Sequence, residues 1–238
     1  MNKTYTKESA VIGVFILAGL ISLGYFIYKG VYQIKAADRY VTVKGLAERT
    51  AEADNAVWPI SFKVTDDDLL KMYTEITKKS ETVVSFLMKN GFMNDEISIS
   101  PPEIKDMLAE QYYNDRPKSY RYIGKMTITV NTENVKLVLS TRKNLSELVK
   151  NGIALSSDYD DRAQFTFTRL NKIKPDMIEK ATLNARKAAL KFAGDSGSKL
   201  GNIKKAWQGQ FVISDRDSNT PYIKKIRVVS TLQYFLVD

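Results

Sequence analysis

The sequence has 238 residues, of which 44% are hydrophobic and 26% are charged, with 36 basic against 27 acidic side chains. This length and composition indicate a folded chain that buries one sizeable core or two small ones. Neither cysteine nor histidine occurs, which excludes disulfides, thiol nucleophiles, zinc sites built from these ligands and any triad with an imidazole base. Carboxylate acid–base chemistry, a Ser/Lys pair, a lysine Schiff base and an oxygen-ligand metal site stay open.

The N-terminus carries an uncharged apolar stretch over residues 9–28. At about 1.5 Å per residue, a helix of this length spans the roughly 30 Å hydrocarbon layer of a bilayer. Aromatic residues gather at its C-terminal end, where Tyr25, Phe26 and Tyr28 precede Lys29, as in an interfacial belt. We therefore expect a short tail over residues 1–8, a transmembrane signal anchor over 9–28 and a juxtamembrane connector over 29–38.

A cleaved signal peptide is the alternative, because Lys3 and Lys7 form a basic region before the apolar stretch. Two features favour an uncleaved anchor: the stretch exceeds an ordinary signal core of about 7 to 15 residues, and no A-x-A site follows it. Basic residues flank the stretch on both sides, so charge does not decide the orientation. A short tail before a long domain predicts that residues 39–238 lie outside the cytoplasm.

Strand-like alternation begins directly after the connector, in "YVTVKGL", and continues in "VWPISFKV" and "KMTITV". Trp58, Ile60, Phe62 and Val64 fall on one face of the second segment, and Pro59 places that strand at an edge or a bulge. Further strands are predicted in four segments: "EISIS", "AQFTFTR", "IKKAWQGQFVI" and "IRVVSTLQYFLV". Aromatic residues in these strands, such as Trp207, Phe211, Tyr234 and Phe235, belong either to the core or to exposed sheet edges.

Three amphipathic helices alternate with the strands. The first starts near Thr65, which has capping-box spacing to Asp68, and stops near Gly91. The second follows Thr132 and stops at Gly152. The predicted apolar positions are Leu69, Met72, Ile76, Val83 and Leu87 in the first, and Val135, Val138, Leu139, Leu145, Leu148 and Val149 in the second. Strand-helix-strand units of this kind predict an α+β fold with helices packed on a mixed or antiparallel sheet.

The third helix lies in a segment that ends "ARKAALKFAGDSGSKLG", residues 185–201, whose glycines and lysine suggest a phosphate cradle. A P-loop needs a strand before the glycines and a hydroxyl after the lysine, whereas here a helix precedes them and Leu200 follows Lys199. We interpret the segment as a helix that begins with Pro175 in its first turn and ends at Gly194, Gly197 or Gly201. Its predicted apolar stripe is Ile178, Ala181, Ala185, Ala188, Ala189 and Phe192.

Other charged segments have ordinary structural interpretations. Asp158, Asp160 and Asp161 lack calcium-loop spacing and predict a solvated turn, and Asp66–Asp68 predict a helix start. Basic and tyrosine residues between 111 and 122 and the basic pairs near 204 and 224 suggest nucleic acid or anionic lipid. Anionic lipid headgroups fit the formal net charge of +9 and an extracytoplasmic domain better, so we expect no nucleic-acid partner.

Two motifs resemble signatures of the SIMPL-domain family, which includes bacterial periplasmic immunogenic proteins. The first resembles V-x-V-x-G-x-[GA]-E followed by Pro-Asp-x-Ala, and here Ala53 replaces the proline. The second resembles A-x-x-x-A-R-x-x-A followed by G-x-x-L-G. The matching residues are Val41, Val43, Gly45, Ala47, Glu48, Asp54 and Ala56 in the first motif, and Ala181, Ala185, Arg186, Ala189, Gly197, Leu200 and Gly201 in the second.

The resemblance covers residues 39–238 and implies an extracytoplasmic α+β domain that tends to self-associate, with no established catalytic residues. We accordingly expect a non-enzymatic, self-associating envelope protein of the bacterial inner membrane, with its C-terminal domain in the periplasm. No catalytic, cofactor-binding or metal-binding residue is assigned. The alternatives are a protein secreted to the periplasm after signal cleavage, a hydrolase using carboxylate, Ser or Lys chemistry, and an envelope module that binds an anionic ligand.

Overall fold

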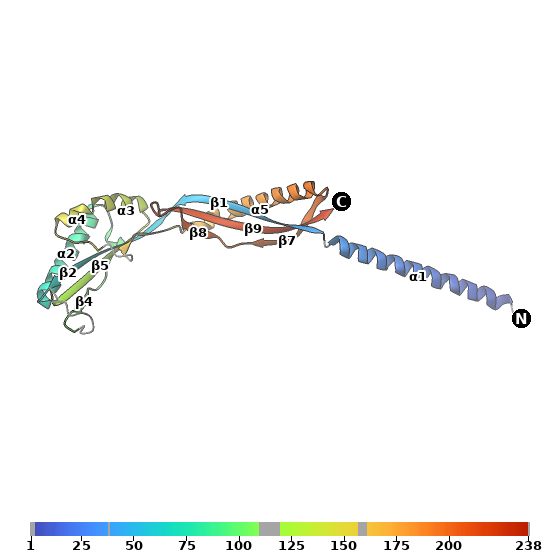
Figure 1. The fold of residues 1–238 in the computed structure, drawn as a ribbon, viewed down its shortest axis with the longest axis horizontal. Coiled ribbons are helices and arrows are strands. Elements are labelled where there is room, and N and C mark those ends of the chain that lie inside the picture. The colour runs from blue at the N-terminus through green and yellow to red at the C-terminus, as the bar shows by residue number, and fades with distance from the viewer. Residues whose placement is uncertain (1–2, 38, 110–119, 157–160, 238) are drawn as a thin grey trace. The chain divides into compact units, whose positions relative to one another are not determined.

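A computed structural model of the chain describes residues 3–37, 39–109, 120–156 and 161–237 (Figure 1). The fold is α+β, as predicted, with antiparallel sheets and helices. The helices are α1 (Lys3–Ala37), α2 (Leu69–Lys89), η1 (Asn94–Glu96), α3 (Val135–Thr141), η2 (Arg142–Asn144), α4 (Ser146–Lys150) and α5 (Leu170–Asp195). The strands are β1 (Tyr40–Glu52), β2 (Asn55–Asp66), β3 (Ile97–Ile99), β4 (Glu103–Asp106), β5 (Tyr122–Thr132), β6 (Gln164–Thr166), β7 (Lys199–Gln208), β8 (Val212–Asp215) and β9 (Ile223–Val237).

Helix α1 contains the apolar N-terminal stretch. Its segment Gly13–Val31 has 19 residues and a mean hydropathy of 1.8, and none of it is buried by the rest of the chain. A helix of this length and composition is sufficient to cross a membrane, and a signal sequence has the same properties.

The chain forms two compact units. Unit 1 comprises Met1–Glu48, Pro175–Phe211 and Arg227–Asp238, and unit 2 comprises Arg49–Lys174 and Val212–Ile226. The boundaries fall inside β1 and β9, directly before β8, and within α5, where the change of unit coincides with Pro175.

Unit 2 is built on a sheet with the strand order β3-β5-β2-β6, in which β4 also pairs with β5. Strands β2 and β5 are antiparallel and keep one register from Ala56↔Thr132 to Asp66↔Tyr122. The alternating residues predicted for β2, namely Trp58, Ile60, Phe62 and Val64, are all buried. Strand β6 pairs with β2 only along Asn55–Val57. Pro59 lies beyond this pairing, so the N–H group that proline lacks is not needed for a hydrogen bond to β6.

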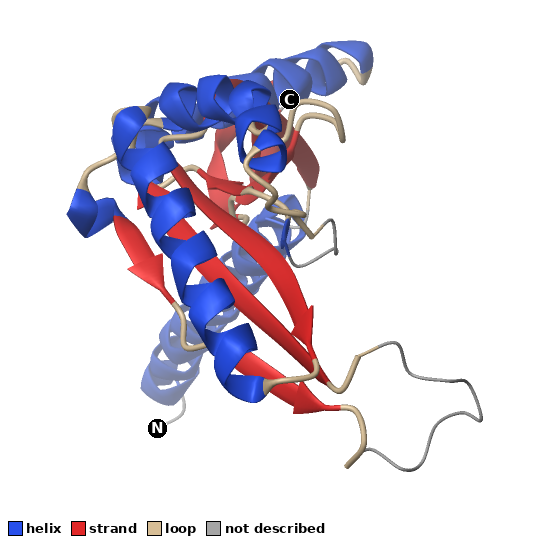
Figure 2. Ribbon diagram, turned by 90° about the vertical axis from the view of Figure 1, so that its left-hand side faces the viewer, coloured by secondary structure: helices blue, strands red, loops and turns tan. Residues whose placement is uncertain are grey.

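Helix α2 lies across one face of this sheet (Figure 2). Asp68 is its N-cap and accepts hydrogen bonds from the N–H groups of Leu70 and Lys71. Beyond its C-terminus, Gly91 has a φ of 103°, a left-handed conformation that glycine adopts without strain. The helix buries Met72, Ile76, Ser80, Val83, Phe86 and Leu87 against the strands. Leu69, predicted for this stripe, is exposed instead because it occupies the first helical position.

The second predicted helix is divided into α3, η2 and α4. Asn134 caps α3 by accepting the N–H of Leu137, and the Ser140 hydroxyl donates to the Leu137 carbonyl. The Ser140 hydroxyl competes in this way with the helical ladder just before the interruption at η2. Gly152, with a φ of 75°, ends the segment as predicted.

Unit 1 contains a sheet with the order β1-β9-β7, and α5 packs on one face of it. The cluster that joins them consists of Val43, Ala185, Ala189, Leu232 and Tyr234. Strand and helix approach closely at Gly45: a Cβ there would overlap the Ala181 carbonyl oxygen and the Ala185 amide nitrogen and lie 2.8 Å from the Ala185 Cβ. The two family signatures therefore meet at this contact.

Three details of α5 differ from the sequence prediction. The helix begins at Leu170, so Pro175 lies inside it and not in its first turn. Its buried stripe contains Met177 and Ala193, whereas Phe192 is 60% exposed. The left-handed residue after the helix is Gly197, with a φ of 68°, and the Ser198 N–H donates to the Ala193 carbonyl. The glycines of residues 194–201 thus end a helix and lead into β7, as the sequence indicated.

Candidate functional site

Asp54 organises the most elaborate polar cluster of unit 2. It lies in the turn between β1 and β2, and its carboxylate accepts the Thr168 N–H at 2.7 Å and the Arg169 N–H at 3.0 Å. The Arg169 Nε lies 3.6 Å from the same carboxylate, whose side chain is 8% exposed. Because α5 begins at the next residue, Leu170, Asp54 satisfies amides at the start of this helix in the way that an N-cap does.

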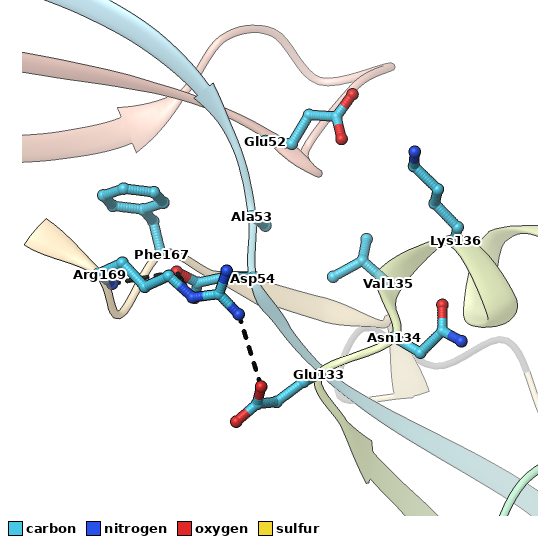
Figure 3. Close-up of a pocket in the computed structure, with 9 residues that line it drawn as sticks. All are labelled: Glu52, Ala53, Asp54, Glu133, Asn134, Val135, Lys136, Phe167 and Arg169. Carbon is cyan, nitrogen blue, oxygen red and sulfur yellow. Dashed lines mark hydrogen bonds and ion pairs between the residues drawn. The ribbon is translucent and has the colours of Figure 1, made fainter.

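The backbone and a second carboxylate complete the cluster. The Asp54 N–H donates to the Thr166 carbonyl at 2.9 Å, and the Ala53 N–H donates to the Tyr222 carbonyl at 2.8 Å. Arg169 also reaches Glu133 at 3.5 Å, so one guanidinium joins two carboxylates, as Figure 3 shows. The network holds together four segments of unit 2 that are distant in sequence: residues 53–54, Glu133, residues 166–169 and Tyr222.

Burial alone would raise the pKa of Asp54. Hydrogen bonds from the Thr168 N–H and hydroxyl and the Arg169 N–H, together with the Arg169 charge, outweigh that effect and hold the pKa below its ordinary value of 3.8. Asp54 is thus an anion at neutral pH.

A shallow cavity of about 290 Å³ adjoins this network and includes Glu52 and Lys136 in its wall (Figure 3). Both Asp54 oxygens accept hydrogen bonds and Arg169 faces two carboxylates, so these groups are already engaged. The arrangement supports a structural clamp better than proton transfer. The family signature pointed to Asp54, but Arg169 and Glu133 carried no sequence signal because tertiary structure alone brings them to it.

Two other cavities of unit 2 share Arg142 and Arg162 in their walls. One, of about 290 Å³, is lined by apolar residues of β2 and the segment after η2 and by an equal number of polar and charged residues. The other, of about 760 Å³, is lined mainly by polar residues of β6 and the segment 215–224. No sequence motif indicated either cavity.

The acidic segments have the structural roles expected of them where they are described. Asp68 caps α2, and Asp66 accepts the Asp68 N–H at 2.8 Å. Asp158 and Asp160 lie outside the described residues. Asp161 is not solvated, in contrast to the prediction: its side chain is 6% exposed and lies 3.8 Å from the Lys125 ammonium. Within the described parts of the chain, no three acidic side chains are grouped as a metal site requires.

The basic residues singled out in the sequence are distributed among separate pairs. The ammonium of Lys224 is buried against Asp215, and Arg227 lies 3.7 Å from Glu48. Lys204 lies over the Tyr40 ring, 4.1 Å from its centroid. Most of the segment rich in tyrosine and arginine, residues 110–119, lies outside the described residues. Arg121, which follows it, pairs with Asp106 at 3.1 Å.

By its fold, the chain is an α+β protein with two antiparallel sheets that follow an apolar N-terminal helix. Comparison with protein families then shows a match over residues 41–224 to the SIMPL family, described as "Protein of unknown function (DUF541)". The chain belongs to the SIMPL family, as its sequence signatures indicated. Comparison with curated proteins finds none that matches.

Proposed function

We propose that this chain is a membrane-anchored, self-associating protein of the bacterial cell envelope, with a structural or interaction role and without catalysis. Helix α1 supports the anchor, because an unburied apolar segment of 19 residues is suited to a bilayer. The orientation that follows places residues 39–238 in the periplasm and the N-terminus in the cytoplasm.

The edge strand β7 is the observation that carries self-association. It lies at the end of the order β1-β9-β7, and Trp207 and Ile203 are both 49% exposed on it. Register shifts interrupt the strand between Leu200 and Lys205, whereas the pairs from Lys205↔Gln233 to Gln208↔Ser230 run without a break. Bulges and lysines at a sheet edge oppose the pairing of one chain after another along that edge. An exposed tryptophan on the regular part of β7 favours a single defined contact with a second copy. The proposed interface therefore centres on Trp207.

The absence of catalysis is supported by the state of the buried polar groups. Ser61 is buried, and its hydroxyl lies 2.8 Å from the Thr127 hydroxyl and 2.5 Å from an Asp161 oxygen. A nucleophilic serine needs access to substrate, whereas Ser61 is only 1% exposed. The hydroxyl of Ser61 is instead part of a hydrogen-bonded network in the sheet.

Sedimentation of the full chain in detergent tests self-association. We expect an oligomer at micromolar concentration, and Trp207→Ser should shift the mass toward the monomer. Leu190→Ser is the matched control, because Leu190 is a similarly exposed apolar residue of unit 1 on α5. A monomeric wild-type chain, or equal masses for wild type and Trp207→Ser, would refute the proposed interface.

The anchor and its orientation need a separate experiment. The chain lacks cysteine, so single cysteines at Thr4 and at exposed Asp195 provide unambiguous labelling sites. An impermeant maleimide added to spheroplasts should label Asp195→Cys and spare Thr4→Cys, and N-terminal sequencing should find the anchor retained. A mature chain that begins near Ala36 or Asp38 would instead establish a cleaved signal.

Anionic lipid headgroups are the proposed second partner, because the net charge of +9 accompanies an anchor that keeps the domain near a membrane surface. Flotation of the full chain in nanodiscs does not separate anchor from headgroup binding. Crosslinking from exposed lysines to lipid amines should therefore rise with the content of phosphatidylethanolamine and anionic lipid, and fall at high salt.

A further inference from the structure

The smaller of the two cavities that share Arg142 and Arg162 combines apolar wall residues with polar and charged ones. The apolar part of the wall comes from two stretches of the chain. Strand β2 contributes Trp58 and Ile60, and the stretch after η2 contributes Leu145 and Leu155. Its volume of about 290 Å³ is near the lower end of the size range of small-molecule sites. A compact apolar group fits such a space.

Arg142 provides a positive charge at this cavity that has no partner among the described residues. It is exposed on η2, and although its backbone N–H donates to the Ser140 and Val138 carbonyls, its guanidinium makes no hydrogen bond or ion pair with any described residue. Arg162 lines the same two cavities. Guanidinium groups bind carboxylates through paired N–H donors, so this end of the cavity suits a carboxylate.

Asp161 provides a negative charge on the same cavity wall. One of its oxygens accepts the Ser61 hydroxyl at 2.5 Å and lies 3.8 Å from the Lys125 ammonium. The other oxygen is buried and accepts no hydrogen bond from any described residue. A buried carboxylate oxygen without a donor is unfavourable. The torsion about the Cβ–Cγ bond of aspartate is soft, so a modest rotation turns this oxygen toward a donor in the cavity.

We propose that this cavity binds a free apolar α-amino acid. The ligand's carboxylate pairs with Arg142, its ammonium donates to the unpartnered oxygen of Asp161, and its side chain packs against Trp58, Leu145 and Leu155. Arg142 and the second oxygen of Asp161 together select a zwitterion over a simple acid or amine, because an acid leaves this oxygen without a donor and an amine leaves Arg142 without a partner. This inference is independent of the proposed self-association.

Trp58 makes binding directly measurable. The chain has 2 tryptophans, so the full chain with Trp207→Phe in detergent has Trp58 as its only one. Titration with L-leucine should give a saturable change in Trp58 emission. Leucinamide, which lacks the carboxylate, and N-acetyl-leucine, which lacks the ammonium, should each bind at least 10-fold more weakly.

Two variants assign the ends of the ligand. Arg142→Gln should weaken leucine at least 10-fold and leave leucinamide unchanged, because leucinamide has no carboxylate for Arg142. Asp161→Asn should weaken leucine similarly and leave N-acetyl-leucine unchanged. Lys143→Gln is the matched control, since Lys143 is the exposed basic neighbour of Arg142 on η2 and should bind leucine as the parent does.

Three outcomes would overturn the proposal: no saturable response to millimolar leucine by a chain whose circular dichroism is native, equal affinities for leucine and its two analogues, or unchanged leucine affinity in Arg142→Gln. If Asp161→Asn fails to fold, the analogues and Arg142→Gln still decide the question. The oligomer mass is measured separately, so loss of self-association and loss of leucine binding are distinguishable results.

Discussion

The two units bury a sheet against a helix in different ways. Unit 2 fills the space between α2 and its sheet with large side chains, among which Phe62, Met72, Ile76 and Ile128 are fully buried. Unit 1 brings α5 so close to β1 that only Gly45 and a stripe of alanines fit between the backbones. Large side chains contribute apolar area, whereas small ones gain van der Waals contact between backbones. The first kind of packing is sensitive to lost volume and the second to added volume.

Each unit contains one of the tryptophans, Trp58 in unit 2 and Trp207 in unit 1. Chains with Trp207→Phe or Trp58→Phe therefore report the unfolding of unit 2 or unit 1 by fluorescence. With these two single-tryptophan chains, the effect of a substitution on the stability of each unit can be measured separately.

The largest effect is expected from Phe62→Ala in unit 2. Removing this fully buried ring leaves a cavity, and the free energy of unfolding should fall by about 3–5 kcal/mol. Urea denaturation followed through Trp58 measures the loss. Phe192→Ala is the control, because the ring of Phe192 is exposed, and it should change stability by less than about 0.5 kcal/mol. Equal effects of the two changes would contradict the volume-filling account.

Gly45→Ala should be the most damaging small change in unit 1. Its new methyl group overlaps the backbone of α5, so strand and helix must separate, at a cost of about 3 kcal/mol. Unfolding followed through Trp207 gives the value. Gly194→Ala is the matched glycine on α5 with nothing within 4 Å of its added Cβ, and it should be neutral or slightly stabilising. A tolerated Gly45→Ala would show that the helix is not held this closely.

Asp54→Asn should lower the stability of unit 2 by about 1–2 kcal/mol, because an amide places a donor where the start of α5 presents N–H groups. The effect should depend on pH in a defined direction. The pKa of Asp54 is lowered by folding, so its contribution is fully present above the ordinary value of 3.8 and is lost as pH falls through the folded-state pKa. Urea midpoints of both proteins between pH 7 and pH 2 should therefore converge at the acid end. A difference that is constant over this range would exclude an ionised Asp54 as its source.

The smallest effects concern the end of α5 and the start of β7. Gly201→Val should cost about 1 kcal/mol by crowding, since an added Cβ comes 2.9 Å from Val237 Cγ2 and 3.1 Å from the Phe235 carbonyl oxygen. The sequence left Gly194, Gly197 and Gly201 open as the left-handed residue, and Gly197 has that role. Lys199→Ala should change stability by less than about 0.5 kcal/mol. Phosphate binding by wild type that is lost in a folded Lys199→Ala chain would restore the cradle interpretation.

Much of the local structure followed from residue patterns. Alternation identified the buried face of β2, and the uncharged N-terminal stretch identified α1. The apolar period identified α2, but the capping-box spacing placed its start near Thr65, which lies in β2; the helix begins at Leu69, and Asp68 is its N-cap. Short-range patterns report these features because they depend on neighbours in sequence and on burial of one face. The same patterns did not predict β4, which is a short exposed strand, or the start of α5 at Leu170, before Pro175. Neither segment has the periodic burial that such patterns detect.

Tertiary structure alone decided which of these surfaces meet. The sequence contained both family signatures, yet nothing local indicated that Gly45 would contact Ala181, or that Asp54 would bind the two amides just before α5, more than a hundred residues away. Arg142 and Asp161 likewise come to one cavity only because the strand register of unit 2 brings their segments together. The sequence by itself therefore determined most of the helices and strands and the buried face of β2, whereas long-range pairing decided the packing and the cavities, because partner choice depends on the whole folded chain.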